Sequence, residues 1–132
     1  MDHVTRSEAS TCGVRVRVEA RYSPEHSDPR RSEWFFLYTI TLTNEGDETC
    51  QLVSRHWIIE NATGKVEEVR GPGVVGEQPV LEPGVSFEYT SGCPLDTPFG
   101  SMRGTYQMVR EDGSTFDAEI ARFELREPRA VH

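Results

Sequence analysis

The sequence lacks any hydrophobic run long enough to cross a membrane. A bilayer-spanning helix needs about 20 consecutive apolar residues, whereas polar or charged residues interrupt every apolar stretch of this 132-residue chain. The segment 1–12 is polar and lacks the apolar region of a secretory signal peptide. We therefore predict no membrane association, no export and a cytoplasmic location.

Cysteine is scarce, and its spacing excludes a disulfide framework. Cys12, Cys50 and Cys93 are odd in number and far apart, with no C-x-x-C pair among them. We expect free thiols in a reducing compartment, with Cys50 and Cys93 packed as small buried hydrophobes.

Clustered metal ligands are also missing. The histidines stand apart, at positions 3, 26, 56 and 132, and only His26 has close acidic neighbours, Glu25 and Asp28. A transition-metal site needs several His, Cys or carboxylate groups together, so we predict no metal-ligating residues. Weak association of Mg²⁺ or Co²⁺ with carboxylates stays open, because Mg²⁺ often takes only one or two carboxylates from a protein.

Basic residues are outnumbered by acidic ones. The chain has 14 Lys and Arg against 22 Asp and Glu, which gives a net charge of −8. Non-specific binding to nucleic acid or to an anionic membrane needs a basic surface. We therefore expect neither of them as a partner.

Helical periodicity is absent, and strand patterning runs through the whole chain. Apolar and polar residues alternate along 14–22 and along 34–42, as in strands with one face in the core. About seven short strands separated by regular turns predict an all-β fold, an antiparallel sandwich of the immunoglobulin or fibronectin-III type. The further strands are expected at 50–60, at 65–70, around Phe87 and Tyr89, and at 104–110 and 115–125, with Asp112-Gly113 as the turn of the last hairpin.

A single domain accounts for this pattern. We predict a sandwich over residues 13–125, with flexible tails at 1–12 and 126–132. Along the last strand the apolar residues move from even positions, ending at Ile120, to odd positions, beginning at Phe123. A shift of one residue predicts a β-bulge near Ala121-Arg122.

The run Val69–Pro79 contains a G-x-G-x-x-G match, a spacing that lets the backbone approach pyrophosphate in dinucleotide-binding folds. No helix follows the third glycine here, because Pro79 and a turn-and-strand pattern come next, and this excludes that mode of binding. Two interpretations stay open. Either the glycines meet positive φ angles or close packing in a long loop, or backbone N–H groups form an anion nest to which an arginine adds charge. The candidate anion site consists of Arg70, Gly71, Gly73, Gly76, Glu77 and Gln78.

Recognisable catalytic constellations are absent. The segments 91–93 (Ser-Gly-Cys) and 54–56 (Ser-Arg-His) supply nucleophile and base residue types, but no nucleophile elbow surrounds them. We predict no catalytic residues and a non-enzymatic protein, with a hydrolase as the alternative. Arg55 shares a strand face with Trp57, which indicates a bulge or an edge position and makes Arg55 a further candidate for contact with an anion.

The stiff loop 94–100 carries an apolar pair, Leu95 and Phe99. We expect this pair to be exposed. An exposed apolar pair serves a partner surface or caps the sandwich, and the sequence leaves both interpretations open.

Six motifs follow one another along the chain. They are Arg55-His56-Trp57-Ile58-Ile59, Glu68-Val69-Arg70-Gly71, Gly73-Val74-Val75-Gly76-Glu77-Gln78-Pro79, Leu81-x-Pro83-Gly84, Phe87-x-Tyr89-Thr90-Ser91-Gly92 and Gly100-x-Met102-x-Gly104-x-Tyr106. In this order, and over about residues 14–125, they resemble the ApaG family. The resemblance implies a fibronectin-III-like sandwich. Two positions depart from the family pattern: Pro72 stands where an acidic residue is common, and Ala121 stands where a proline is usual.

The resemblance also carries functional implications. Bacterial members of the family are small stand-alone proteins that carry a label of cobalt and magnesium efflux. In eukaryotes the domain is attached to an F-box ubiquitin-ligase subunit and to a polymerase-interacting protein, which implies partner binding. The glycine motif of the family has been likened to a pyrophosphate-binding loop.

The sequence thus predicts a non-enzymatic binding module. The leading hypothesis is interaction with a protein partner, or self-association, through a sheet edge, because edge strands offer unpaired backbone groups. The family label links this role to cobalt and magnesium homeostasis. The alternative is binding of a nucleotide or pyrophosphate at residues 70–78, with a divalent metal as companion.

Overall fold

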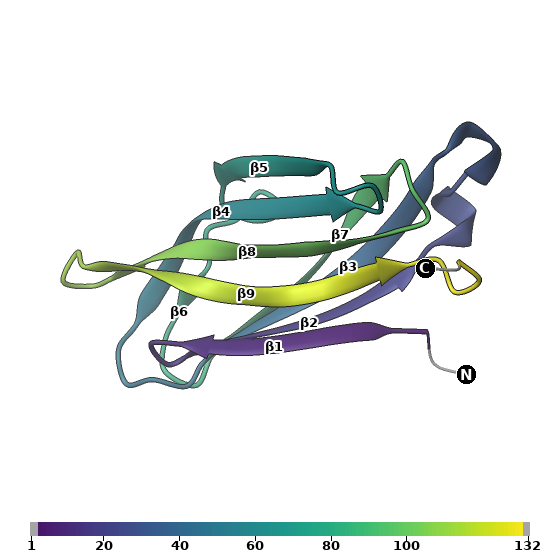
Figure 1. Cartoon of the computed structure of the whole chain (residues 1–132). Coiled ribbons are helices and arrows are strands. Elements are labelled where there is room, and N and C mark those ends of the chain that lie inside the picture. Colours follow the sequence, from purple (N-terminus) through teal and green to yellow (C-terminus); the bar gives the residue numbers. More distant parts are fainter. Residues whose placement is uncertain (1–2, 131–132) are drawn as a thin grey trace.

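The computed structural model describes residues 3–130. Two antiparallel sheets pack face to face, and the predicted all-β sandwich is confirmed (Figure 1). Two single-turn 3₁₀ helices, η1 (Pro24–His26) and η2 (Pro29–Arg31), precede the third strand. The strands are β1 (Thr5–Thr11), β2 (Val14–Tyr22), β3 (Trp34–Asn44), β4 (Cys50–Asn61), β5 (Val66–Pro72), β6 (Val80–Leu81), β7 (Ser86–Leu95), β8 (Phe99–Arg110) and β9 (Thr115–Arg126).

One sheet has the strand order β1-β2-β3-β7 and the other the order β5-β4-β8-β9, with the short β6 also paired to β4. β1 and β6 were not among the predicted strands. The prediction of a flexible tail over 1–12 is therefore wrong for Thr5–Thr11, which form β1. The reason is that this strand alternates small polar residues with charged ones, so it has no apolar period. Residues 1–2 and 131–132 of the predicted tails, including His132, lie outside the described residues.

β1 closes one side of the sandwich against β9 (Figure 1). Thr5 Oγ1 donates to the carbonyl of Glu124 at 2.5 Å, and Ser7 Oγ donates to the carbonyl of Ala121 at 2.7 Å. Thr11 Oγ1 accepts a hydrogen bond from the amide of Glu119. These side chains link strands of different sheets, so the polar residues that hid β1 from the sequence pattern are the ones that seal this side.

The predicted bulge in the last strand is confirmed. The register of β8 and β9 changes between the pairs Met102–Phe123 and Gly104–Ile120, which leaves one extra residue in β9 at Ala121-Arg122. Gly104 lies at this point, and a Cβ atom there would lie 2.1 Å from the carbonyl oxygen of His56. Glycine at this position therefore allows β8 to lie close to β4 beside the bulge.

The core holds a group of aromatic side chains from both sheets. Trp57 packs edge-on against Tyr38, Tyr106 and Phe123, with ring centroids 5.4, 6.4 and 6.0 Å away. The hydroxyls of Tyr89 on β7 and Tyr106 on β8 hydrogen-bond to each other between the sheets. Burial raises the pKa of both phenols, so both hydroxyls are protonated at neutral pH and one can donate to the other.

We expect Tyr106→Phe to lower the free energy of unfolding by about 1–3 kcal/mol, because it leaves the buried hydroxyl of Tyr89 without this partner. Removing both hydroxyls in Tyr89→Phe/Tyr106→Phe is expected to cost less than the sum of the two single changes. Urea denaturation of the four proteins measures this coupling. Strictly additive changes in the free energy of unfolding would contradict the hydrogen bond between the two hydroxyls.

Candidate functional site

The side of the sandwich opposite β1 and β9 ends in two free strand edges. Among residues 3–130, β5 pairs only with β4, and β7 pairs only with β3 (Figure 1). Five of the seven strand residues Val66–Pro72 are exposed, and Val66 is 53% exposed. An edge strand of this kind presents backbone groups that can pair with another chain.

The hydrogen bonds at the two ends of β5 identify which of its backbone groups face outward. The amide of Asn61 donates to the carbonyl of Lys65, and the amide of Gly73 donates to the carbonyl of Val53. Because bonded and non-bonded pairs alternate along an antiparallel ladder, the odd-numbered residues of β5 bond to β4. Residues 66, 68, 70 and 72 therefore direct their backbone groups away from β4, and the last of these is Pro72, which has no N–H to offer.

The glycine run forms a small hairpin beside this edge. The chain leaves β4 at Gly73, and Val74 and Glu77 exchange amide-to-carbonyl bonds of 2.8 Å in both directions. Val75 (φ 42°) and Gly76 (φ 81°) occupy the two central positions of the turn, as in a type I′ hairpin. The chain then returns to β4, where the amide of Leu52 donates to the carbonyl of Pro79.

Arg55 holds the start of this hairpin in place. Its Nη1 donates to the carbonyl oxygens of Pro72 at 2.9 Å and Gly73 at 2.8 Å. The guanidinium lies across Gly71, where a Cβ atom would lie 2.9 Å from Nη2. A register shift between Leu52 and Ser54 places Arg55 opposite Tyr106 on the inner side of the sheet, so the predicted bulge is present. Arg55 thus binds backbone carbonyls at the end of β5.

The six residues of the predicted anion site do not converge on one point. Gly71 lies within β5 beneath Arg55, and Arg70 lies on the outer face, 73% exposed and 3.7 Å from Glu68. The amides of Gly73 and Glu77 bond to carbonyls of the chain itself, and the side chain of Gln78 donates to Val53. The structural interpretation of the glycines accounts for these contacts; anion binding stays a prediction.

The positions of Gly73 and Gly76 show why glycine is needed in this hairpin. Gly73 has a φ of 59°, and a Cβ atom there would lie 2.3 Å from the carbonyl oxygen of Glu77. Gly76 has a φ of 81° but open space around it. Val75 is a β-branched residue with positive φ and is 54% exposed, and nothing in the sequence predicts this strained conformation.

Of the remaining candidate groups, His56 lies beside this edge and the others lie elsewhere. Among residues 3–130 no group of three or more His, Cys, Asp or Glu side chains is placed to hold a metal ion. His26 Nδ1 bonds to Ser23 Oγ at 2.7 Å, and His56 Nε2 donates to Glu68 Oε1 at 2.7 Å. Burial raises the pKa of the Cys93 thiol to about 12, with a further contribution from Glu67, so this thiol is protonated at neutral pH.

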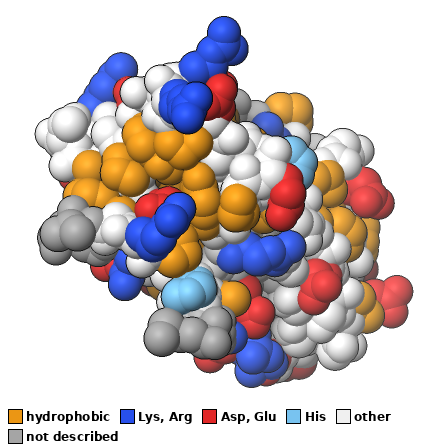
Figure 2. Space-filling model, turned by 90° about the vertical axis from the view of Figure 1, so that its right-hand side faces the viewer, with side chains coloured by type: hydrophobic (Ala, Val, Ile, Leu, Met, Phe, Trp, Pro, Cys, Tyr) orange, Lys and Arg blue, Asp and Glu red, His pale blue; other side chains and the backbone are white. Residues whose placement is uncertain are grey.

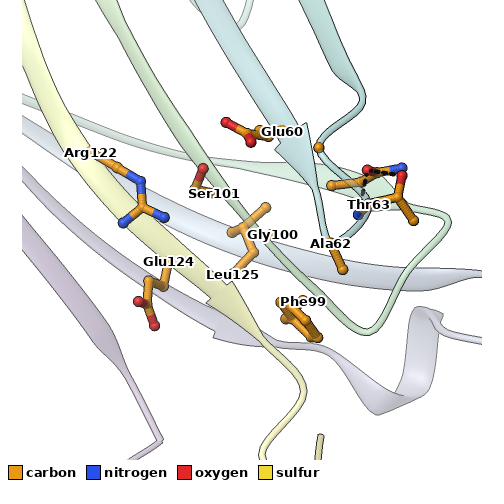
Figure 3. Close-up of a pocket in the computed structure, with 11 residues that line it drawn as sticks. Glu60, Ala62, Thr63, Phe99, Gly100, Ser101, Arg122, Glu124 and Leu125 are labelled. Carbon is orange, nitrogen blue, oxygen red and sulfur yellow. Dashed lines mark hydrogen bonds between the residues drawn. The ribbon is translucent and has the colours of Figure 1, made fainter. Parts of the chain in front are cut away.

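Two shallow pockets lie at the end of the molecule where the β4–β5 and β7–β8 turns meet, and hydrophobic side chains there alternate with charged ones (Figure 2). In one of them, of about 500 Å³, Glu60 comes from β4 and Arg122 and Glu124 come from β9, while Ala62 lies in the β4–β5 turn and Phe99 at the start of β8 (Figure 3). The other, of about 450 Å³, lies between β5 and β7.

Leu95 and Phe99 are less exposed than the sequence suggested. Leu95 is only 7% exposed and belongs to the core, and Phe99 is half-buried. The expectation of an exposed pair is wrong, because Leu95 packs against Gly100, where a Cβ atom would lie 2.9 Å from its Cδ1. Leu95 therefore caps this end of the sandwich.

These features define a small two-sheet β-sandwich module, sealed along one side and open along a strand edge with a glycine hairpin on the other. The chain belongs to the ApaG domain family, which matches residues 24–110. This confirms the resemblance found in the motifs. In the part of the chain that the structure describes, no helix is long and apolar enough to span a membrane.

Several relatives resemble the chain over nearly its whole length. Protein ApaG of Bordetella pertussis is 55% identical over 117 residues, covering 89% of this chain and 89% of that protein. Protein ApaG of Dechloromonas aromatica is 52% identical over 126 residues, covering 96% and 99%. The crystal structure of the putative ApaA protein from Bordetella pertussis superposes with a TM-score of 0.85 and 54% identity, covering 89% of this chain and 95% of that one.

The two glycines of the hairpin provide a matched pair of substitutions. We expect Gly76→Ala to cost about 1–2 kcal/mol of stability, because only its φ is unfavourable for alanine. Gly73→Ala adds a clash with the Glu77 carbonyl and is expected to cost about 2–5 kcal/mol. Thermal and urea denaturation measure both values. Equal costs for the two variants would contradict the packing role of Gly73.

Two arginines near this edge are expected to differ in their contribution to stability. Arg55→Met removes both bonds to the hairpin and is expected to cost about 2 kcal/mol, with faster amide exchange at Gly73 and Val74. Arg70→Met, at the exposed partner of a surface ion pair, is expected to change stability by no more than about 0.5 kcal/mol. Urea denaturation and hydrogen exchange test this, and similar effects of both changes would refute the role given to Arg55.

Proposed function

We propose that this domain is a non-enzymatic protein-interaction module that accepts an extended segment of a partner along the outer edge of β5. The observation that carries the proposal is the row of outward-facing backbone groups at Val66, Glu68 and Arg70 on a strand that pairs on one side only. Strand addition to such an edge uses main-chain hydrogen bonds for affinity and the flanking side chains for specificity.

β5 is better suited to this role than β7, the other open edge. Three side chains of β7 are bonded to β3, among them Thr90 to Thr39 and Glu88 to Thr41, whereas on β5 Glu68 is bonded to His56 of β4. β5 instead carries an exposed valine, Val66, together with charges of both signs. Its edge therefore offers apolar and ionic groups to an incoming strand.

We further propose a cytoplasmic location and a role in metal homeostasis. A cytoplasmic location is supported by the three free cysteines, because disulfides are rare in that compartment. The family's cobalt and magnesium label then refers to homeostasis served through a protein complex, in which the partner supplies the metal chemistry.

Anion binding at residues 70–78 is the second candidate, with a nucleotide or pyrophosphate as ligand and Mg²⁺ or Co²⁺ as companion. It is supported by the exposed guanidinium of Arg70, beside a turn that is open to solvent at Gly76. Titration of ¹⁵N-labelled protein with pyrophosphate, with and without Mg²⁺, tests it. Saturable shifts confined to residues 70–78 would support this candidate over strand addition.

A library of displayed ten-residue peptides tests strand addition at β5. We expect selected peptides to shift the amide resonances of residues 66–70 and to protect the outward amides from exchange. Glu68→Pro is expected to abolish binding, because it removes an outward N–H while leaving the ladder with β4 intact. Glu88→Pro on β7 is the matched control and should leave binding unchanged. Peptides that bind equally well to Glu68→Pro, or a library without binders, would overturn the proposal.

A further inference from the structure

We propose that the strand received by β5 is the β5 strand of a second copy of this chain, paired antiparallel about a two-fold axis at Val69. This inference rests on the proposed function of β5 as an accepting edge, and it names the partner. An isologous pair of this kind is closed, so it gives a dimer and not a fibre. The order of charges along the strand favours this pairing.

Backbone geometry restricts the registers that two copies can adopt. Only residues 66, 68, 70 and 72 direct backbone groups outward, so these must face one another across the new ladder. Two-fold pairing that overlaps at least five residues of β5 in each copy is then centred on residue 68, 69 or 70, because centres at 67 and 71 overlap only three residues. A centre between two residues would set outward groups against inward ones.

Charge selects one of these three registers. Centring on residue 68 places Glu68 opposite its own copy, and centring on residue 70 does the same for Arg70. Like charges directly opposite each other on neighbouring strands are destabilising. Centring on Val69 instead places Glu68 opposite Arg70 of the second copy, and the two-fold axis repeats this ion pair. Both side chains lie on the outer face of the sheet, where Glu68 already lies 3.7 Å from Arg70 of its own chain.

The inner face of the same register is also complementary. It sets Glu67 opposite Gly71 of the second copy, and Gly71 is the residue across which the guanidinium of Arg55 lies. Arg55 and Glu67 both lie on the inner side of their sheet, because their register partners are Tyr106 and Ile59. An acidic side chain that points inward on an edge strand would thus meet the arginine that holds the glycine hairpin.

The ends and the middle of the pair fit this register. Val69, which packs partly into the core, meets its own copy at the axis. Pro72 faces Val66 of the other copy at each end of the ladder, so its missing N–H removes only a terminal bond. Beyond Pro72 the chain turns into the hairpin that begins at Gly73, and this limits the pair to the length of β5.

Sedimentation equilibrium of the full chain, from about 10 µM to about 1 mM, tests the dimer. Each copy carries a net charge of −8, so the measurement needs about 0.15 M salt, where the screening length of about 8 Å suppresses long-range repulsion. We expect wild type to associate. Glu68→Arg and Arg70→Glu each create two like-charge pairs and are expected to weaken association on the order of tenfold.

The double variant Glu68→Arg/Arg70→Glu reverses both ion pairs and is expected to restore association. Glu88→Arg on β7 changes the net charge by the same amount as Glu68→Arg and is the matched control. It should associate as wild type does. Circular dichroism confirms that each variant is folded. Wild type that stays monomeric, or a double variant that remains as weak as the single ones, would overturn the proposal. If peptides from the library still shift the β5 amides of a monomeric wild type, only self-pairing fails and strand addition stands.

Discussion

The geometry of the open side of this sandwich, at the end of β5 and the glycine hairpin, depends on the position of the Arg55 guanidinium. The bulge between Leu52 and Ser54 turns Arg55 towards the inner side of β4, next to a core of aromatic rings. A charge in that position must be bonded or reach solvent. Arg55 does both, because it lies across a glycine at position 71 and donates to the carbonyls of Pro72 and Gly73. The shape of the hairpin and the end of β5 follow from this contact.

The two sides of the molecule solve the problem of sheet edges differently. β1 and β9 are also edge strands of their sheets, and they are joined by side-chain hydrogen bonds between the sheets, such as that from Ser7 to Ala121. β5 and β7 have no such cover among the described residues. Proteins often protect open edges with proline or charge, and β5 carries both. On its outer face Glu68 and Arg70 carry opposite charges, and in the proposed strand addition these charges would disfavour registers that set like charges opposite each other.

The fold was largely predictable from sequence, and the site was not. Alternation along β2 and β3, the hairpin at Asp112-Gly113 and the phase shift at Ala121 all report burial, which leaves a period in the sequence. β1 was not predicted because its contacts with β9 are hydrogen bonds from polar side chains such as Ser7, which leave no apolar period in the sequence. The role of Arg55 escaped because it consists of bonds from a side chain to backbone carbonyls, and carbonyls have no sequence signature. The only sequence sign of this role was that Arg55, a polar residue, shares a strand face with Trp57.

The glycine motif has a different structural role in this fold. In a dinucleotide-binding loop the glycines clear space for a phosphate; here Gly71 clears space for Arg55, and Gly73 clears space for the carbonyl of Glu77. The space left by these two glycines is thus filled by groups of the chain itself. In the proposed strand addition, the backbone of β5 and the charges of Glu67, Glu68 and Arg70 would select an incoming strand by its register. The glycine run would serve this role indirectly, because Gly71 leaves room for the arginine that holds the end of β5.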